Sequence, residues 1–326
     1  MQSTRVLRRT VLAATLAGVA AATTVAGPAL ADDATGSLSG FIRDTRGAVI
    51  TDASVSIYPA SSTDPIDSAQ VDSRGRFSVT GLRAGSYQIS IGMGGWSEWA
   101  PGRVTDRLEA RTYRVAADRT TPANSVVTAA GIVTGRIFDT NGRPAANAGV
   151  SLSILTTASD QDGVTGADGT YRIRVRPNST FKVAYQVGPF YQFVPHTYDS
   201  SQATRFYVAA GQTVRIPDDR AIPAAGITGR LTDAAGAPVG NAVVNFTNVD
   251  SAYPSDTTTA ADGTYDFAGY LIPGRYKVEF RVAGRSQYSY QKPDYTSADV
   301  ITVASGQTAI VDDQLLWVPA PQQPAS

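Results

Sequence analysis

The sequence contains no cysteine, and only one histidine and three glutamates stand among its 326 residues. Without cysteine there can be neither a disulfide nor a thiolate metal site. A Ser-His-Asp set would have to use the single histidine, His196, which follows Pro195 in a loop-like run. We interpret His196 as an exposed loop imidazole, and the scarcity of these residue types argues against nucleophilic catalysis.

The carboxylates also lack a catalytic pattern. Glycosidases place two carboxyl groups across a cleft, but Glu98, Glu109 and Glu279 do not recur at equivalent positions. A catalytic barrel needs about 250 residues, and three repeats of about 94 residues leave no room for one. The run Asp160-Gln161-Asp162-Gly163 lacks the spacing and the terminal glutamate of a calcium loop. We therefore predict a protein that is not an enzyme and needs no cofactor or metal.

Charge is low and balanced, since 28 Lys and Arg stand against 28 Asp and Glu and charged residues make up 17% of the chain. No basic block longer than a few residues follows the N-terminal segment. Nucleic-acid binding requires clustered Lys and Arg to neutralise phosphates. The composition therefore predicts no nucleic-acid partner.

The N-terminal 31 residues have the pattern of an export signal. Three arginines precede an apolar run over residues 11–22, and Ala29-Leu30-Ala31 offers small residues at the spacing that a signal peptidase reads. We expect residues 1–31 to be a signal peptide, cleaved between Ala31 and Asp32. The apolar run is too short to span a bilayer comfortably. The prediction is a secreted, extracellular protein without a membrane span in its mature chain.

A unit of about 94 residues occurs three times, which is the strongest signal in the sequence. Its first anchor is a Gly-x-x-x-Asp segment, its second a turn around Asp-Gly, and its third the start of a Tyr- or Phe-led strand. The equivalent segments are 40–44, 135–139 and 229–233, then 74–77, 168–171 and 262–265, then 86–89, 180–183 and 275–278. A period of this length fits one small β-sandwich per copy.

Each copy alternates apolar and polar residues with a period of two, which indicates strands with one buried face. The apolar positions include Val55 and Ile57, Val150 and Leu152, and Val244 and Phe246. No amphipathic helix follows the signal segment. The fold class predicted is all-β, with tandem modules at 32–118, 130–220 and 226–318 and a disordered Pro/Gln-rich tail at 319–326.

The unit resembles the carboxypeptidase regulatory-like domain. The third copy carries the motifs most cleanly, in Gly226-Ile227-Thr228-Gly229, Asp262-Gly263 and Pro273-Gly274-Arg275-Tyr276. The first copy departs from them, because Arg74 replaces the aspartate of the turn. The resemblance implies three tandem seven-stranded transthyretin-like (prealbumin-like) β-sandwiches. Proteins with this domain are often grouped with carbohydrate-binding-like sandwiches, and others are stalks, adhesins or appendages of other proteins. The resemblance therefore implies a binding or a structural function.

Aromatic residues cluster after the third anchor of every copy. The candidate ligand-binding residues are Trp96, Trp99, Phe190, Tyr191, Phe193, Tyr288 and Tyr290. Flat rings with a polar handle suit sugar faces and peptides, but rings that close a sandwich over its core would repeat equally well. Two functions stay open. One is binding of a glycan or cell-envelope polymer through these rings, and the other is a structural or adhesive spacer that presents a surface to a protein partner.

Overall fold

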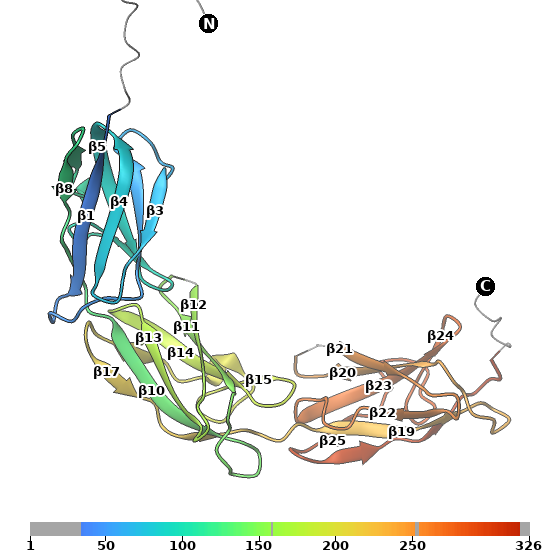
Figure 1. Ribbon diagram of the computed structural model, residues 1–326. Helices are drawn as coiled ribbons and strands as arrows, with labels where there is room; N and C mark the ends of the chain where they lie inside the picture. Colours follow the sequence, from blue (N-terminus) through green and yellow to red (C-terminus); the bar gives the residue numbers. More distant parts are fainter. Residues whose placement is uncertain (1–33, 158, 252–253, 320–326) are drawn as a thin grey trace, which may run out of the picture.

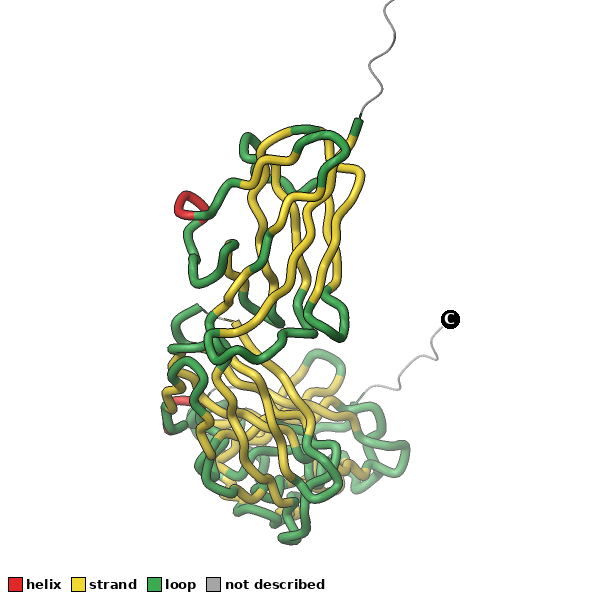
Figure 2. The backbone as a smooth tube through the Cα atoms, turned by 60° about the vertical axis from the view of Figure 1, so that its left-hand side comes forward, coloured by secondary structure: helices red, strands yellow, loops and turns green. Residues whose placement is uncertain are grey.

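The computed structural model describes residues 34–157, 159–251 and 254–319. Their strands form six sheets, which pack in pairs around three hydrophobic clusters. Figure 1 shows the three pairs end to end along a bent path, and we call them the first, second and third units. Two short 3-10 helices, η1 (Arg107–Glu109) and η2 (Ser200–Gln202), lie on loops outside the sheets (Figure 2). The predicted all-β class is confirmed.

Several predictions concern residues outside this range. The signal peptide with its cleavage site at Ala31 and Asp32 lies outside the described residues, as do residues 320–326 of the predicted tail. Within the described ranges, no helix has the length and hydropathy needed to cross a membrane.

Each unit is built from nine strand segments in the same order. Those of the first unit are β1 (Thr35–Asp44), β2 (Ser54–Pro59), β3 (Asp67–Gln70), β4 (Arg76–Arg83), β5 (Gly85–Gly92), β6 (Ser97–Trp99), β7 (Tyr113–Val115), β8 (Thr120–Pro122) and β9 (Ser125–Val127). Those of the second are β10 (Gly131–Phe138), β11 (Gly149–Ile154), β12 (Ser159–Val164), β13 (Thr170–Val175), β14 (Ser179–Gln186), β15 (Tyr191–Phe193), β16 (Phe206–Val208), β17 (Thr213–Arg215) and β18 (Asp219–Arg220). Those of the third are β19 (Gly226–Thr232), β20 (Val243–Asn248), β21 (Pro254–Thr258), β22 (Thr264–Asp266), β23 (Gly274–Val282), β24 (Arg285–Tyr288), β25 (Ile301–Val303), β26 (Thr308–Ile310) and β27 (Asp313–Gln314).

The two sheets of a unit have four and five segments. In the four-stranded sheet, the first strand of the unit pairs antiparallel with the fourth and parallel with the last two segments, which follow one another along the same edge. In the five-stranded sheet, the sixth and seventh segments likewise share one edge of the fifth strand. Because two edge positions hold two segments each, the nine segments of a unit occupy seven strand positions. The resemblance implied seven strands for each unit.

The predicted alternation of apolar residues forms the cores. The positions singled out in the sequence, from Val55 to Phe246, are at most 2% exposed. In the third unit Phe246 stacks on Phe267, with ring centroids 5.0 Å apart. Burying a side chain of this size contributes about 1.5–3 kcal/mol. Each unit thus has a core of its own, whereas the folding of each unit in isolation stays a prediction.

In the first and third units, the glycine that opens the repeated motif has a steric role at one point of the four-stranded sheet. There the chain crosses from one edge segment to the next and passes close to the first strand. A Cβ on Gly229 would lie 2.0 Å from the carbonyl oxygen of Val311, and one on Gly40 would lie 2.6 Å from that of Ala123. Any other side chain would therefore push the crossing away from the sheet.

One predicted boundary leaves out part of a sheet. The first module was predicted to end at Asp118, but β8 and β9 over residues 120–127 pair with β1 and complete the four-stranded sheet of the first unit. The sequence suggests a linker there because the stretch is polar and contains Pro122. A proline is compatible with an edge strand, where its missing N–H faces away from the ladder.

The Asp-Gly turns between the sheets are held by their aspartates. Asp168 accepts hydrogen bonds from the backbone N and the Oγ1 of Thr170 at 3.0 and 2.7 Å, and Asp262 does the same with Thr264 at 3.0 and 2.6 Å. The first unit has Arg74 in place of this aspartate. There Asp72, two residues earlier, accepts from the backbone N atoms of Arg74 and Arg76, both at 2.8 Å.

These turns predict an acid-sensitive contribution to stability. The threonine hydrogen bonds hold the pKa of Asp168 and of Asp262 below the usual 3.8. A lowered folded-state pKa stabilises the fold above the usual value, and this stabilisation is lost as the pH falls through the folded pKa. We expect the free energy of unfolding to fall less between neutral pH and about pH 3 in the double variant Asp168→Asn/Asp262→Asn than in the wild type. Urea denaturation at a series of pH values measures this free energy. Asp256→Asn, on an exposed strand position, is the control, and an equal acid loss in the double variant and the wild type would contradict the assignment.

Candidate binding surfaces and the linker clamps

The outer face of each five-stranded sheet carries one of the predicted aromatic residues. Trp99 on β6, Phe193 on β15 and Tyr288 on β24 occupy equivalent positions, opposite Ser90, Ala184 and Glu279 of the adjacent strand. All three aromatic side chains are half-buried, and the residue before each of them points into the core. The repeat thus sets one ring on the same outward position of every unit.

Trp99 belongs to a small cluster on this face. Its ring meets Tyr58 edge-on, with centroids 5.0 Å apart. The guanidinium of Arg107 lies 5.0 Å from the Tyr58 centroid and 5.2 Å from that of Trp99. Arg107 also donates to the carbonyl of Pro59 and to Oε1 of Gln88, at 2.9 and 2.8 Å. The cluster is therefore pre-formed, with part of both rings covered by a fixed cation.

The other predicted aromatic residues are distributed over the strand ends. Phe190 meets Tyr198 edge-on with centroids 6.1 Å apart, and Tyr288 meets Tyr295 at 6.0 Å. Tyr191 and Tyr290 are 57% and 49% exposed. These rings do not join into one continuous surface across the units.

Trp96 occupies a different environment from the rest of the predicted set. It is 8% exposed and belongs to the hydrophobic cluster of the first unit. Its indole Nε1 is buried without a hydrogen-bond partner among the described residues. Trp96 therefore offers no open ring face to a ligand.

A buried polar side chain lies one residue before each outward ring. Glu98, Gln192 and Gln287 are 4%, 1% and 2% exposed. Each of them reaches a backbone N–H about 30 residues further along the chain, where the unit ends. The acceptors are a carboxylate in the first unit and side-chain amides in the other two. We call this arrangement the linker clamp.

The clamps make two kinds of hydrogen bond. Glu98 Oε2 accepts from the backbone N of Thr128 at 3.0 Å and from that of Arg103 at 2.6 Å. Gln192 uses both ends of its amide on Ile222, accepting from the backbone N at 2.6 Å and donating to the carbonyl oxygen at 3.3 Å.

The third unit repeats the arrangement of the second. Gln287 accepts from the backbone N of Leu316 and donates to the carbonyl oxygen of Gln314, both at 2.9 Å. In every unit a buried side chain thus accepts a hydrogen bond from a backbone N–H at the chain exit, that of Thr128, Ile222 or Leu316, which belong to no strand.

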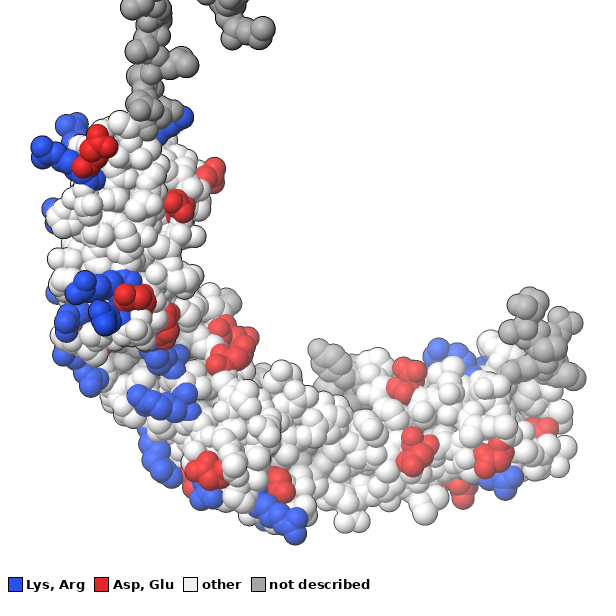
Figure 3. All heavy atoms as spheres, in the orientation of Figure 1, with Lys and Arg blue, Asp and Glu red and all other residues white. Residues whose placement is uncertain are grey.

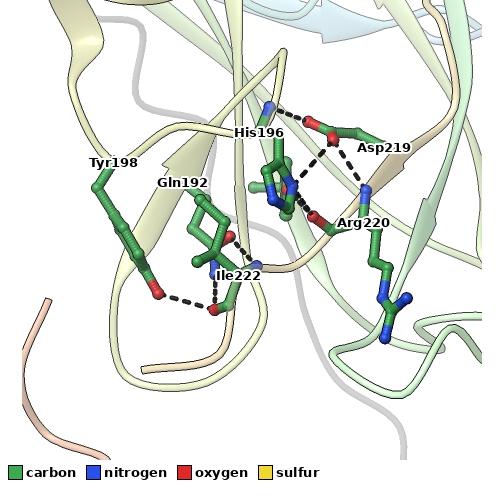
Figure 4. Close-up of polar contacts among 7 residues, drawn as sticks. Gln192, His196, Tyr198, Asp219, Arg220 and Ile222 are labelled. Carbon is green, nitrogen blue, oxygen red and sulfur yellow. Dashed lines mark hydrogen bonds and ion pairs between the residues drawn. The ribbon is translucent and has the colours of Figure 1, made fainter. Parts of the chain in front are cut away.

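The clamp of the second unit is reinforced by its neighbours (Figure 4). Tyr198 Oη also donates to the carbonyl oxygen of Ile222, at 2.8 Å. Burial raises the pKa of this hydroxyl to about 12, so it remains a donor at neutral pH. His196 donates its backbone N–H to Asp219 at 2.9 Å, and its Nδ1 lies 2.8 Å from the carbonyl oxygen of Arg220. The two residues that precede the linker are thereby held as well.

His196 therefore has a local structural role. Its side chain is 58% exposed, in line with the interpretation as a loop imidazole. For Nδ1 to pair with a carbonyl it must carry the proton and donate it, which fixes the tautomer. No serine or threonine hydroxyl bonds to the ring within the described part of the chain, so the geometry of a catalytic triad is not formed here.

The ends of the first and second units are also joined directly. Arg46 donates to the carbonyl oxygen of Gly211 at 2.6 Å, and Asp52 forms an ion pair with Arg174. Gly95 lies against the second unit, since a Cβ there would come 3.2 Å from Nε2 of Gln161. These contacts fix the first unit on the second in addition to its clamp.

Metal binding is not supported by the arrangement of acids. Across residues 34–157, 159–251 and 254–319, no group of three or more His, Cys, Asp or Glu side chains is placed to hold an ion. Asp160 and Asp162 of the calcium-like run instead line a recess of about 480 Å³ between the first two units, together with Asp52 and Arg174.

The clamp residues were missed in the sequence, although a signal for them exists. Residues 98, 192 and 287 follow the repeat spacing, and each is polar at the position next to a repeated aromatic residue. A polar residue that recurs at the inward position of a strand indicates a buried hydrogen-bond partner. The difference between a Glu and two Gln hides this equivalence.

Comparison with known proteins gives a match at the level of the domain. The model of the carboxypeptidase regulatory-like domain matches residues 37–128 and 226–315. No curated protein matches the chain.

Three solved structures illustrate the structural similarities. The Bacillus anthracis TIE protein is 14% identical, with 86% of this chain and 50% of that chain covered and a TM-score of 0.26. A streptococcal ancillary pilin is 12% identical, with 88% and 100% covered and a TM-score of 0.37. A minor pilin of Streptococcus agalactiae is 13% identical, with 60% and 100% covered and a TM-score of 0.36. The chain thus spans about half the length of the first of these proteins and the whole length of the two pilins.

Proposed function

The chain belongs to the carboxypeptidase regulatory-like domain family, and we propose that it is a non-catalytic extracellular spacer that holds three β-sandwich units in fixed relative positions. In this function the protein presents surfaces of its units to a partner, either a cell-envelope polymer or a surface protein. The observation that carries the proposal is the linker clamp, whose copies at residues 98 and 192 hold the connections between the units.

The clamps distinguish a rigid spacer from a string of loosely tethered units. Releasing the linker at Ile222 leaves the buried amide of Gln192 without a partner, which costs about 1–3 kcal/mol. A free-energy difference of that size favours the held linker roughly 5- to 150-fold. A buried polar group is costly unless it is hydrogen-bonded, so the clamps at Glu98 and Gln192 favour linkers that stay in place.

The linker between the second and third units is held from both sides. Gln192 and Tyr198 of the second unit bind Ile222, and Ser305 of the third unit donates to the carbonyl oxygen of Pro223 at 3.0 Å. Pro223 itself has a restricted φ angle. A linker of a few residues with contacts at both ends transmits the orientation of one unit to the next.

Distance measurements between two spin labels test this proposal. Since the chain has no native cysteine, the labels can be attached at Thr156→Cys in the second unit and Thr302→Cys in the third. We expect a narrow distance distribution in the parent chain and a broader one after Gln192→Ala, because that substitution removes both hydrogen bonds to Ile222. The measurement is pulsed electron paramagnetic resonance.

The control variant is Gln202→Ala, which removes an exposed glutamine of the same unit. It should leave the distribution as narrow as in the parent. A broad distribution in the parent, or equal widths for Gln192→Ala and Gln202→Ala, would rule out the rigid spacer.

A second candidate function is weak binding of a glycan or cell-envelope polymer. The observation that favours it is the outward ring at the same position of every unit, Trp99, Phe193 and Tyr288, with the exposed Tyr191 and Tyr290 at nearby strand ends. One stacked ring contributes about 0.5–1.5 kcal/mol, so a single unit would bind weakly. Units held in fixed positions can raise avidity 100-fold or more, as an order of magnitude, when they reach one polymer.

Retention on insoluble starch, cellulose and peptidoglycan tests the second function. We expect the wild type to be retained on one of them and the Trp99→Ala/Tyr191→Ala variant to lose most of this retention without a change in Tm. Tyr207→Ala, which removes another ring exposed at 55%, should bind like the wild type. Absence of retention on all three polymers, or equal retention of both variants, would contradict glycan binding through these rings.

A further inference from the structure

The four-stranded sheet of the second unit carries a group of arginines on its outer face. Arg172 on β13 and Arg215 on β17 are both paired with Thr134 of β10, so they flank it in one row across three strands. Strands in a sheet are about 4.8 Å apart, which puts the two arginine Cα atoms roughly 10 Å from each other. Arg136 lies two residues after Thr134 on the same face, and the three side chains therefore surround one area.

These arginines line a recess of about 490 Å³. The remaining lining residues include Gly135, Thr170, Tyr171 and Asp218. Three guanidinium groups stand against one carboxylate there, an excess of two positive charges. Arg172 also lines the neighbouring recess that contains Asp160 and Asp162. Figure 3 shows the wider setting, with basic side chains gathered along the convex side of the first two units, whereas acidic ones predominate on the visible face of the third.

The side chains of the recess differ in how firmly they are held. Arg136 donates from Nε to the carbonyl oxygen of Asp168 at 2.8 Å, and its guanidinium lies 4.7 Å from the ring centroid of Phe138. Arg215 pairs with Asp218 at 2.7 Å. Arg172 is exposed, and its side chain forms no ion pair or hydrogen bond within the described residues. The recess thus contains one positioned cation and one that is free to bind a ligand.

The chain crossing beside this recess is one residue longer than in the other units. Three residues, 216–218, separate β17 from β18, whereas two separate β8 from β9 and β26 from β27. On the first strand of every unit, the last residue paired with one edge segment and the first residue paired with the next are three positions apart, as Thr134 and Ile137 are in the second unit. The second unit therefore has a bulge at this point, a feature that often re-aims side chains next to functional sites.

The bulge leaves donors without their usual acceptors. In the first unit the backbone N of Phe41 donates to Asn124 at 3.2 Å, and in the third that of Arg230 donates to Asp312 at 2.8 Å. The equivalent N–H of Arg136 has no acceptor in the crossing segment 216–218, because Asp218 is turned toward Arg215.

A tyrosine hydroxyl beside the bulge also lacks the acceptor that its counterpart has in the third unit. In the third unit Tyr265 Oη donates to the carbonyl oxygen of Val311 at 2.6 Å. Its counterpart Tyr171 lines the recess and is 4% exposed, and its Oη is buried without a partner in the described part of the chain. The hydroxyl lies next to Gly135, where a Cβ would be only 2.4 Å away.

The corresponding recesses of the other units have a different charge. That of the first unit, about 640 Å³, has Asp72 and Arg76 among its lining residues and is neutral. That of the third, about 650 Å³, contains Arg230 with Asp312 and Asp313 and carries an excess of negative charge. The fold thus provides a hollow at the crossing of each unit, and the sequence makes the second one cationic.

We propose that this recess of the second unit is a binding site for a tetrahedral oxyanion, a phosphate or sulfate group. Planar guanidinium groups bind such oxyanions with two parallel hydrogen bonds. Arg172 and Arg215 approach the anion from opposite sides, Arg136 contributes a positioned charge, and its backbone N–H is a further donor. Asp218 competes with the anion for Arg215, so the site binds more weakly than three free arginines would.

Titration calorimetry of the full chain with sodium sulfate and with sodium phosphate tests the site, at constant low ionic strength because salt screens exposed charges. We expect binding of at least one of the two anions with a Kd of about 1 mM or tighter. Arg172→Gln should weaken it by about tenfold or more, because the charge-assisted hydrogen bonds of one guanidinium group are lost. Asp218→Asn should strengthen it, because Arg215 is released.

The control is Arg114→Gln, which removes an exposed arginine of β7 in the first unit. It should bind like the wild type. Amide chemical shifts locate the anion, and the backbone N–H of Arg136 should respond while that of Arg230 does not. Absence of binding of both anions, equal binding by Arg172→Gln and Arg114→Gln, or weaker binding by Asp218→Asn would overturn the proposal.

Discussion

A hydrogen bond from a buried side chain to a linker amide is the interaction on which the arrangement of the three units depends. Each unit has an apolar cluster of its own, but these clusters do not set the positions of the units relative to one another. The backbone that leaves the unit, however, needs acceptors and donors when it passes over the end of the sandwich. Glu98, Gln192 and Gln287 supply them from inside the core.

The two sheets of a unit contribute different features. The five-stranded sheet contributes the clamp residue on its inner side and an aromatic residue, next in sequence, on its outer side, because neighbouring residues of a strand face opposite ways. The four-stranded sheet contains the crossing at which glycine allows the chain to approach closely. One additional residue at this crossing distinguishes the second unit from the other two, and a recess lined by arginines lies beside it.

Periodicity in the sequence was enough to predict the all-β class, the repeat and the inward apolar residues. It was also enough to identify the turn aspartates of the second and third units, whereas Asp72 of the first lies at a different position of its turn. Aromatic residues near strand ends were less informative, since Trp96 and Trp99 are three residues apart and only the latter reaches the outer face. Alternation is lost at such ends, so the direction of a ring depends on tertiary packing.

Sites that are formed by segments far apart in the chain could not be predicted from the sequence. Arg136, Arg172 and Arg215 are 36 and 43 residues apart, so no basic run marks them, and strand pairing alone places them together. The same holds for the clamps, whose partners are 30 positions away in the first two units. A balanced overall charge does not exclude a local excess of one sign, which arises when side chains of one kind share one face of a sheet.

Amide hydrogen exchange at the chain exits tests the central role of the clamps most directly. Thr128, Ile222 and Leu316 belong to no strand, yet their backbone N–H groups are bound by buried side chains. We predict that these three amides exchange far more slowly than that of Ala224, in the same linker as Ile222, and that Gln192→Ala removes the protection at Ile222 alone. Exchange of Ile222 as fast as that of Ala224 in the wild-type chain would contradict the account.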